Sequence, residues 1–161
     1  MAVAKSVIDA EIKWYNEQIT LVKDNIVKRL KELGHTVEIK DINIKRKEEL
    51  SGTYDTHQFD LIIDNDLKIS LIPYGIWIVG AKGRIEINGP AGSEKLVYFL
   101  KGGPAISTEI KNESGTHVEK QTHKYFNNVD DEDWYWYDDS SYRKVTKFTK
   151  EIVDPLLETI Q

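Results

Sequence analysis

The sequence contains no cysteine in its 161 residues. This absence excludes a disulfide framework, a cysteine-ligated zinc or iron–sulfur site, and a cysteine nucleophile. A chain of this length can still bury enough surface to fold without a covalent or metal cross-link. Because no linker, repeat or low-complexity tract divides the chain, we predict a single domain over residues 1–161.

Long apolar runs are also absent. Runs such as residues 61–63 and 76–79 are far shorter than the roughly 20 residues that a membrane-spanning helix needs. The N-terminal residues lead directly into a segment with Asp9, Glu11 and Lys13, which is unlike a secretory signal peptide. We therefore expect a cytoplasmic protein with no membrane partner.

Positively charged residues are fewer than negatively charged ones. Lys and Arg total 22 against 27 Asp and Glu, which gives a formal net charge of -5. This is the wrong sign for holding a phosphate backbone. The most basic segment, residues 40–47, divides its charges between two faces of a predicted strand and is followed by Glu48 and Glu49. The charge pattern therefore argues against a nucleic acid partner.

Apolar residues recur at steps of three and four over the first part of the chain. They are Ile8, Ile12, Tyr15, Ile19, Val22, Ile26, Leu30 and Leu33. This spacing predicts an amphipathic helix from about residue 5 to Leu33. Gly34 can adopt the left-handed conformation that ends a helix.

From Thr36 onward apolar and polar residues alternate, which predicts half-buried strands. The predicted strands cover residues 37–39, 42–44, 59–63, 67–71, 76–79, 84–87, 96–100 and 106–111, with a polar edge strand over residues 116–126. Asn and Asp tolerate positive φ, so residues 64–66 predict a tight hairpin. The other connections are too short for crossover helices, and we predict an antiparallel β-meander of about six or more strands.

The last apolar stripe predicts a C-terminal helix. It contains Tyr142, Val145, Phe148, Ile152 and Leu156. Ser140 or Ser141 is the expected N-cap, and Pro155 is expected to bend or restart the helix. The predicted fold class is therefore α+β, with a long N-terminal helix, the antiparallel meander, and a C-terminal helix, the helices forming a single layer packed on the sheet.

The segment over residues 130–139 has the most unusual composition, because six carboxylates surround four consecutive aromatic residues. Its members are Asp130, Asp131, Glu132, Asp133, Trp134, Tyr135, Trp136, Tyr137, Asp138 and Asp139. On a strand the two Trp side chains share one face and the two Tyr side chains share the other, and we expect one pair to be buried. If the other pair stays exposed, it forms aromatic anchors inside an acidic rim, which suits a basic protein partner. If both pairs pack in the core, the acids only solvate the flanks.

Motifs for metal and phosphate binding are missing. The histidines, His35, His57, His117 and His123, lack metal-ligand spacing and are expected in surface or capping roles. Residues 64–66 resemble the start of a calcium loop, but Ile69 stands where Gly is required and Gly75 where a bidentate carboxylate is required. Residues 89–95 lack the glycine spacing of a phosphate-binding loop. We therefore predict no metal, no cofactor and no catalytic residues.

A metal-dependent nuclease is the enzyme alternative. Glu38-Ile39-Lys40 and Glu109-Ile110-Lys111 match its Glu-x-Lys tripeptide, in which carboxylates bind Mg²⁺ and the lysine polarises water. Neither tripeptide follows a strand that ends in an acid. This alternative requires carboxylates such as Asp60 or Asp64 to converge with Glu86 beside a lysine.

The leading hypothesis from the sequence is a non-enzymatic protein-binding module of the immunity-protein, antitoxin or defence-accessory type. It would dock on a basic protein through the acidic and aromatic residues 130–139. The alternative is a small-ligand carrier with an apolar cavity between the sheet and the first helix, lined by residues such as Trp14, Phe59, Trp77 and Phe99. The identity of the partner, the oligomeric state and the strand order stay open.

Overall fold

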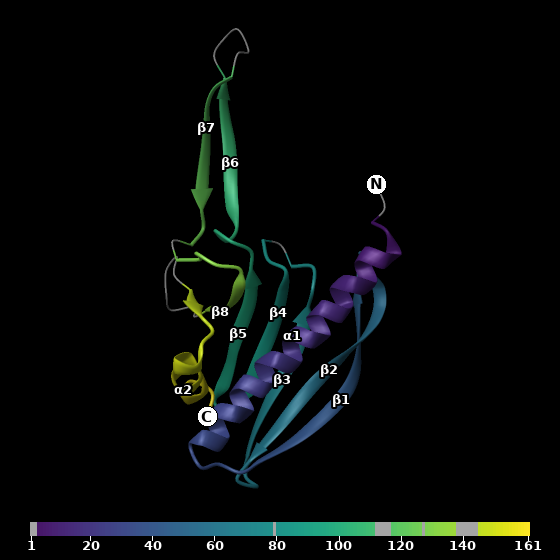
Figure 1. Cartoon of the computed structure of the whole chain (residues 1–161), viewed down its shortest axis with the longest axis vertical. Coiled ribbons are helices and arrows are strands. Elements are labelled where there is room, and N and C mark those ends of the chain that lie inside the picture. Colours follow the sequence, from purple (N-terminus) through teal and green to yellow (C-terminus); the bar gives the residue numbers. More distant parts are fainter. Residues whose placement is uncertain (1–2, 79, 112–116, 127, 138–144) are drawn as a thin grey trace.

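The computed structural model describes residues 3–78, 80–111, 117–126, 128–137 and 145–161, with only the backbone described for residues 106–111 and 117–122. It contains a long N-terminal helix, a seven-stranded antiparallel sheet, a separate two-stranded hairpin and a short C-terminal helix (Figure 1). This is the α+β fold that the sequence predicts.

The N-terminal helix α1 (Lys5–Glu32) occupies the range that the apolar spacing predicts. Its buried residues are Tyr15, Ile19, Val22, Ile26, Val27 and Leu30. Gly34 follows the helix with a φ of 90°, and the backbone N–H of His35 donates to the carbonyl of Leu30. Glycine adopts this left-handed conformation without a Cβ clash, so the chain turns sharply into the first strand.

The main sheet has the strand order β1-β2-β3-β4-β5-β8-β9, and all neighbours are antiparallel. The strands are β1 (Val37–Glu48), β2 (Gly52–Ile63), β3 (Leu67–Gly75), β4 (Gly83–Gly89), β5 (Gly92–Phe99), β8 (Asp133–Tyr137) and β9 (Thr146–Lys147). In the turn between β2 and β3, Asp64 and Asn65 have φ values of 52° and 58°. The hairpin predicted at residues 64–66 is therefore confirmed.

The two strands β6 (Ala105–Lys111) and β7 (His117–Lys124) form their own sheet and project away from the main one (Figure 1). The edge strand predicted over residues 116–126 is therefore β7, in a separate two-stranded sheet. β8, not β7, pairs with β5. The physical reason is that β6 and β7 satisfy each other's backbone hydrogen bonds, while the polar β7 sequence offers no apolar face to the core.

The prediction of a strand over residues 76–79 is wrong for residues 76–78, which are the part that the structure describes. Residues 76–78 form bends and one isolated bridge between Ile78 and Ala81. The register shifts between Pro73 and Gly75, where β3 ends. The N–H groups of Ile76 and Trp77 then donate to the side chain of Glu48 and not to a neighbouring strand.

The first strand is less buried than its alternation predicts. β1 is one continuous strand of 12 residues, and Ile39 and Ile42 are 41% and 38% exposed. The reason is its place in the sheet, since β1 is the outermost strand and pairs only with β2. Its lysines fit an edge strand, because charged side chains discourage pairing with another chain.

The C-terminal helix α2 (Lys150–Glu158) begins later than predicted. Residues 138–144, which include the predicted caps Ser140 and Ser141, lie outside the described residues. Thr149 is the N-cap, and β9 pairs with β8 just before it. Because this pairing uses the backbone groups of residues 146–147, they cannot belong to a helix. Pro155 lies inside α2, which continues to Glu158.

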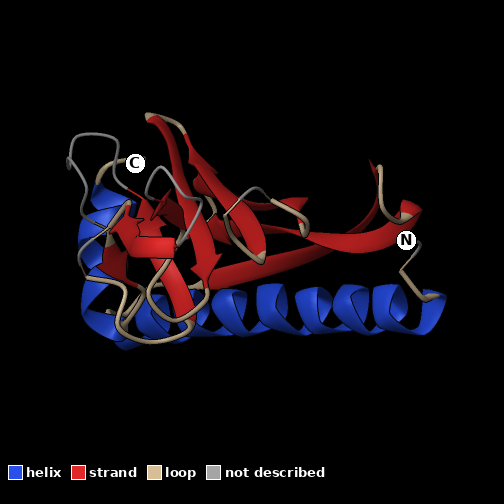
Figure 2. Cartoon of the chain, turned by 90° about the horizontal axis from the view of Figure 1, so that it is seen from above, coloured by secondary structure: helices blue, strands red, loops and turns tan. Residues whose placement is uncertain are grey.

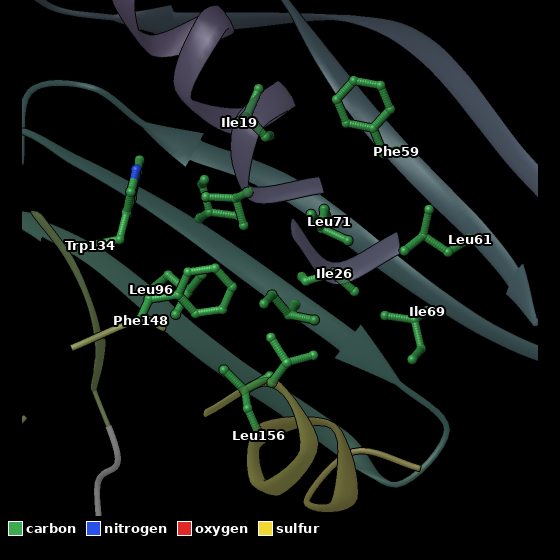
Figure 3. Close-up of a cluster of buried hydrophobic side chains, with 14 of the residues drawn as sticks. Ile19, Ile26, Phe59, Leu61, Ile69, Leu71, Leu96, Trp134, Phe148 and Leu156 are labelled. Atoms are coloured by element: carbon green, nitrogen blue, oxygen red, sulfur yellow. The ribbon is translucent and has the colours of Figure 1, made fainter. Parts of the chain in front are cut away.

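Both helices pack on the same face of the main sheet and contribute to one core there. Most of the length of α1 lies along that face (Figure 2). Ile19 and Ile26 of α1, Leu61 and Leu71 of the sheet and Leu156 of α2 meet there (Figure 3). A second, smaller cluster contains Val97, Phe99, Val129, Tyr135 and Val145. No described helix is both long and apolar enough to cross a membrane.

Candidate functional site

The strand β8 places the aromatic residues of the acidic segment inside the protein. Trp134, Tyr135 and Trp136 are only 3%, 2% and 8% exposed, and Tyr137 is half-buried. The indole N–H of Trp134 donates to Gln18 at 2.9 Å, and that of Trp136 donates to Glu94 at 2.8 Å. Three of the four predicted aromatic anchors therefore hold the strand in the core and are not available to a partner.

The acids just before them remain at the surface. We call Asp130, Asp131, Glu132 and Asp133 the acidic loop; the first three are exposed and Asp133 is half-buried. Asp138 and Asp139 lie outside the described residues. The Tyr135 hydroxyl donates to the backbone carbonyl of Asp131 at 2.8 Å, which ties the loop to β8.

Nearby groups offset part of this negative charge. The Lys147 ammonium lies 3.2 Å from a carboxylate oxygen of Asp131 and 3.7 Å from one of Asp133. The hydrogen bond to Asp131 raises the pKa of Lys147. The Tyr98 hydroxyl donates to Glu132 at 3.0 Å, and burial together with this carboxylate raises the pKa of Tyr98 to about 12. The loop therefore presents less free negative charge than its sequence suggests.

The face of the sheet opposite the helices carries a different set of side chains. Val97 on β5 lies opposite Arg84 on β4 and opposite Tyr135 on β8, and residues directly opposite in an antiparallel pair point to the same face. Val97 and Tyr135 belong to the second cluster, not to the core under the helices. Lys95, Phe99 and Tyr137 share this face, because each is an even number of residues from Val97 or Tyr135 along its own strand.

A pocket of about 340 Å³ lies on this face. Its floor is formed by side chains of the sheet, namely Arg84, Lys95, Val97, Phe99 and Tyr137. Its walls come from loops, namely Ile78 and Ala81 between β3 and β4, Pro104 before β6 and Phe126 after β7. We call this the back-face pocket.

Aromatic rings give the back-face pocket its shape. The ring centroids of Phe99 and Phe126 are 5.3 Å apart, and those of Phe126 and Tyr137 are 5.7 Å apart in an edge-on arrangement. Such pairs pack favourably and orient one another. The pocket therefore has apolar surfaces made of packed aromatic rings, and the main core lies on the other face of the sheet.

Two cations lie among these apolar groups. The guanidinium of Arg84 stacks on the Tyr74 ring, with its central carbon 3.9 Å from the ring centroid, and one of its amino groups donates to Glu86 at 2.7 Å. The Arg84 Nε is buried and has no hydrogen-bond partner. The Lys95 ammonium lies 5.6 Å from the centroid of the Tyr137 ring. The described lining of the pocket contains cations and no carboxylate.

The loop that supplies Ile78 is held by a half-buried carboxylate. Glu48, the last residue of β1, accepts hydrogen bonds from the N–H groups of Ile76 and Trp77, each at 3.1 Å, and from the hydroxyl of Tyr54. Burial and this carboxylate raise the pKa of Tyr54 far above its usual value. Glu48 thereby positions the loop between β3 and β4 against the pocket.

The four residues that the sequence predicts around a cavity between the sheet and α1 lie in different places. Phe59 packs in the main core and Phe99 in the second cluster, so they lie on opposite faces of the sheet. Trp14 packs edge-on against Tyr98 at 4.8 Å, and Trp77 packs against Tyr54 at 6.1 Å. The four residues therefore do not line a common space.

The carboxylates needed for a nuclease have other partners. Asp60 accepts hydrogen bonds from Gln58 and Ser70, Asp64 contacts His35 and Thr36, and Glu86 pairs with Arg84. Within the described residues no three His, Asp or Glu side chains come together as a metal site would require. The side chains of Glu109 and Lys111 lie outside the described part of the chain.

Two histidines have clear surface roles. His35 lies 2.7 Å from Asp64 and His57 lies 2.8 Å from Asp41, and both rings are partly exposed. The bonds from His35 and the Thr36 N–H lower the pKa of Asp64. His123 is exposed, and the side chain of His117 is not among those described.

The sequence analysis missed the back-face pocket. Its residues come from strands β4, β5 and β8 and from three loops, so no local motif marks them. Comparison of the chain with protein-family models, curated proteins and solved structures finds no match in any of the three. Function is therefore inferred from the chemistry of the pocket and the acidic loop.

Proposed function

We propose that this chain is a non-enzymatic binding protein that holds a small, partly apolar ligand in the back-face pocket. One observation carries the proposal: a concave site of about 340 Å³ that is lined by three aromatic rings, by other apolar side chains and by two charged side chains. Small-molecule sites are concave and mostly apolar, with a few polar groups that orient the ligand. A cytoplasmic location remains a prediction from the sequence.

Calorimetric titration with naphthoate and naphthamide tests this proposal. The two probes have the same flat apolar body and differ in charge. A ligand of this size gains about 0.3 kcal/mol per non-hydrogen atom in an ordinary site, which corresponds to a dissociation constant of about 1 mM. We expect saturable binding of at least one probe at this strength or tighter.

The substitution Ala81→Trp tests whether binding occurs in the back-face pocket. Ala81 lies in its wall, so an indole there fills the space and should abolish binding. Ala10→Trp is the matched control, because Ala10 is exposed on α1. Thermal unfolding of both variants shows whether they fold. Absence of binding by the wild-type chain, or equal binding by Ala81→Trp, contradicts the proposal.

Docking on a basic protein is the second candidate function, as for an immunity-protein, antitoxin or defence-accessory module. The observation in its favour is that Asp130, Asp131 and Glu132 are exposed in a loop that buried aromatic residues anchor. Exposed charges of one sign steer a partner of the opposite charge. The contact would rely on charge more than on the aromatic anchors that the sequence suggested.

Affinity capture tests this second candidate with a matched pair of baits. The wild-type chain and the double variant Asp130→Asn and Asp131→Asn are compared at low and moderate salt. We expect a basic protein that the wild type retains at low salt, that moderate salt releases, and that the variant fails to retain. Identical retention by both baits, or none by the wild type, removes the candidate.

A further inference from the structure

Two cationic side chains, Arg84 and Lys95, line the back-face pocket. Glu86 pairs with one amino group of Arg84 and also lies opposite Lys95 in the pairing of β4 with β5. An apolar surrounding strengthens the attraction of a cation for an opposite charge, because little water is present to screen it. A neutral apolar ligand would make no charged contact with the Arg84 guanidinium.

The hydrogen bonding of Arg84 is incomplete. Arginine carries five N–H donors in a fixed plane. The Nη2 group donates to Glu86, while the Nε–H is buried with no acceptor. A buried polar group without a partner is uncommon, and one on a charged side chain is costly to leave unsatisfied.

Arg84 is also held in place. Its guanidinium stacks on Tyr74, and Glu86 fixes one end of the guanidinium plane. The side chain is still 21% exposed and forms part of the pocket floor. A guanidinium that is fixed before the ligand arrives loses little freedom on binding, which favours a tight contact.

We propose that the ligand of the back-face pocket is a small organic anion, a carboxylate on a flat apolar body, and that Arg84 binds the carboxylate. The apolar body packs against Phe99, Phe126 and Tyr137. This inference rests on the proposed function, since it names the chemical class of the ligand for the same pocket.

The probe pair naphthoate and naphthamide distinguishes the inference that the ligand is an anion from the proposal that the pocket binds a ligand. A hydrogen bond to a charged group contributes about 1.5–3 kcal/mol, so naphthoate should bind about ten- to a hundredfold more tightly than naphthamide. Added salt should weaken naphthoate binding and leave naphthamide binding unchanged. Equal affinity for the two probes overturns the anion inference and leaves the pocket proposal standing. Binding of neither probe overturns both.

Variants of Arg84 test the assigned contact. Arg84→Gln should weaken naphthoate binding by about ten- to a hundredfold and change naphthamide binding by less than about twofold. Arg84→Lys keeps the charge but loses the planar fork, so it should recover only part of the affinity. Lys31→Gln removes one positive charge from the exposed surface of α1 and is the matched control. Naphthoate binding that Arg84→Gln leaves intact overturns the assignment.

The side-chain resonance of Arg84 provides a readout that needs no variant. In the wild-type protein, saturation with naphthoate should shift the N–H protons of the Arg84 amino groups downfield, because a donor at the pocket gains an acceptor. Naphthamide should change these signals less. Amino-group signals of Arg84 that do not respond to bound naphthoate contradict the contact even if a variant fails to fold.

Discussion

At the scale of single residues, Glu48 illustrates how one side chain connects distant segments. It lies at the end of β1, contacts Tyr54 of β2, and accepts two backbone N–H groups after β3. Gly75 makes this approach possible, since a Cβ there would lie 3.1 Å from a Glu48 oxygen. The loop that carries Ile78 to the back-face pocket depends on this carboxylate.

We predict that Glu48→Ala lowers the free energy of unfolding by about 3 kcal/mol, because buried donors left without an acceptor cost about 1–3 kcal/mol each. Chemical denaturation measures this change. Glu49→Ala is the matched control at the next, exposed position and should have little effect. Equal losses in the two variants would show that Glu48 does not hold the loop.

The aromatic residues of β8 show what residue type alone does not determine. Their alternation over two faces follows from the sequence, but both faces prove to be covered, one by the helices and the other by the second cluster. Of the covering residues, Val129 is an isolated apolar residue in a polar stretch, and Val145 belongs to the stripe that predicts the C-terminal helix. No local pattern in the sequence links them to Tyr135.

At the scale of elements, the contact between α1 and α2 depends on charge. Arg29 forms a two-pronged ion pair with Asp154 at 2.8 and 2.9 Å, and Lys150 lies 2.8 Å from Glu32. The hydrogen bond from Arg29 lowers the pKa of Asp154, and that from Lys150 lowers the pKa of Glu32. These pairs add to the apolar contacts of Val153 and Leu156 with the main core.

The two carboxyls make stability depend on pH in the acid range. Because their folded-state pKa values lie below the ordinary values of 3.8 and 4.5, the ion pairs stabilise the protein above those values. The stabilisation is lost as the pH falls through the lower folded-state values. We predict that Asp154→Asn reduces the loss of stability between about pH 5 and pH 2.

Thermal unfolding across this pH range measures the effect. Asp9→Asn, at an exposed position of α1, is the control and should leave the pH dependence close to that of the wild type. An unchanged pH profile in Asp154→Asn would mean that the ion pairs do not stabilise the folded state.

Elements with regular local patterns are the ones that the sequence predicts well. The stripe from Ile8 to Leu33 predicts α1 within a residue or two, and the Asp-Asn turn predicts the β2–β3 hairpin. The predicted start of the C-terminal helix is wrong, because residues 146–147 pair with β8. Sequence spacing does not reveal this contact between segments. The strand prediction for the segment after β3 is wrong because Glu48 accepts the hydrogen bonds of its backbone N–H groups.

At the scale of the whole molecule, the two faces of the main sheet are covered by different parts of the chain. Both helices pack on the front face, and the four residues predicted to line a cavity there do not lie together. On the back face the described loops lie beside β4, β5 and β8, and the pocket lies between them. The pocket depends on strand order, because β5 pairs with β8 across the inserted hairpin of β6 and β7.

The measurement that tests the binding function most directly is chemical-shift mapping of the wild-type chain during titration with naphthoate. Binding in the back-face pocket predicts saturable shifts at the backbone amides of Ile78, Ala81, Val97 and Phe99, with α1 unaffected. Shifts scattered over α1 and β1, or no saturable shifts at millimolar probe, would contradict the assignment of this pocket as the binding site.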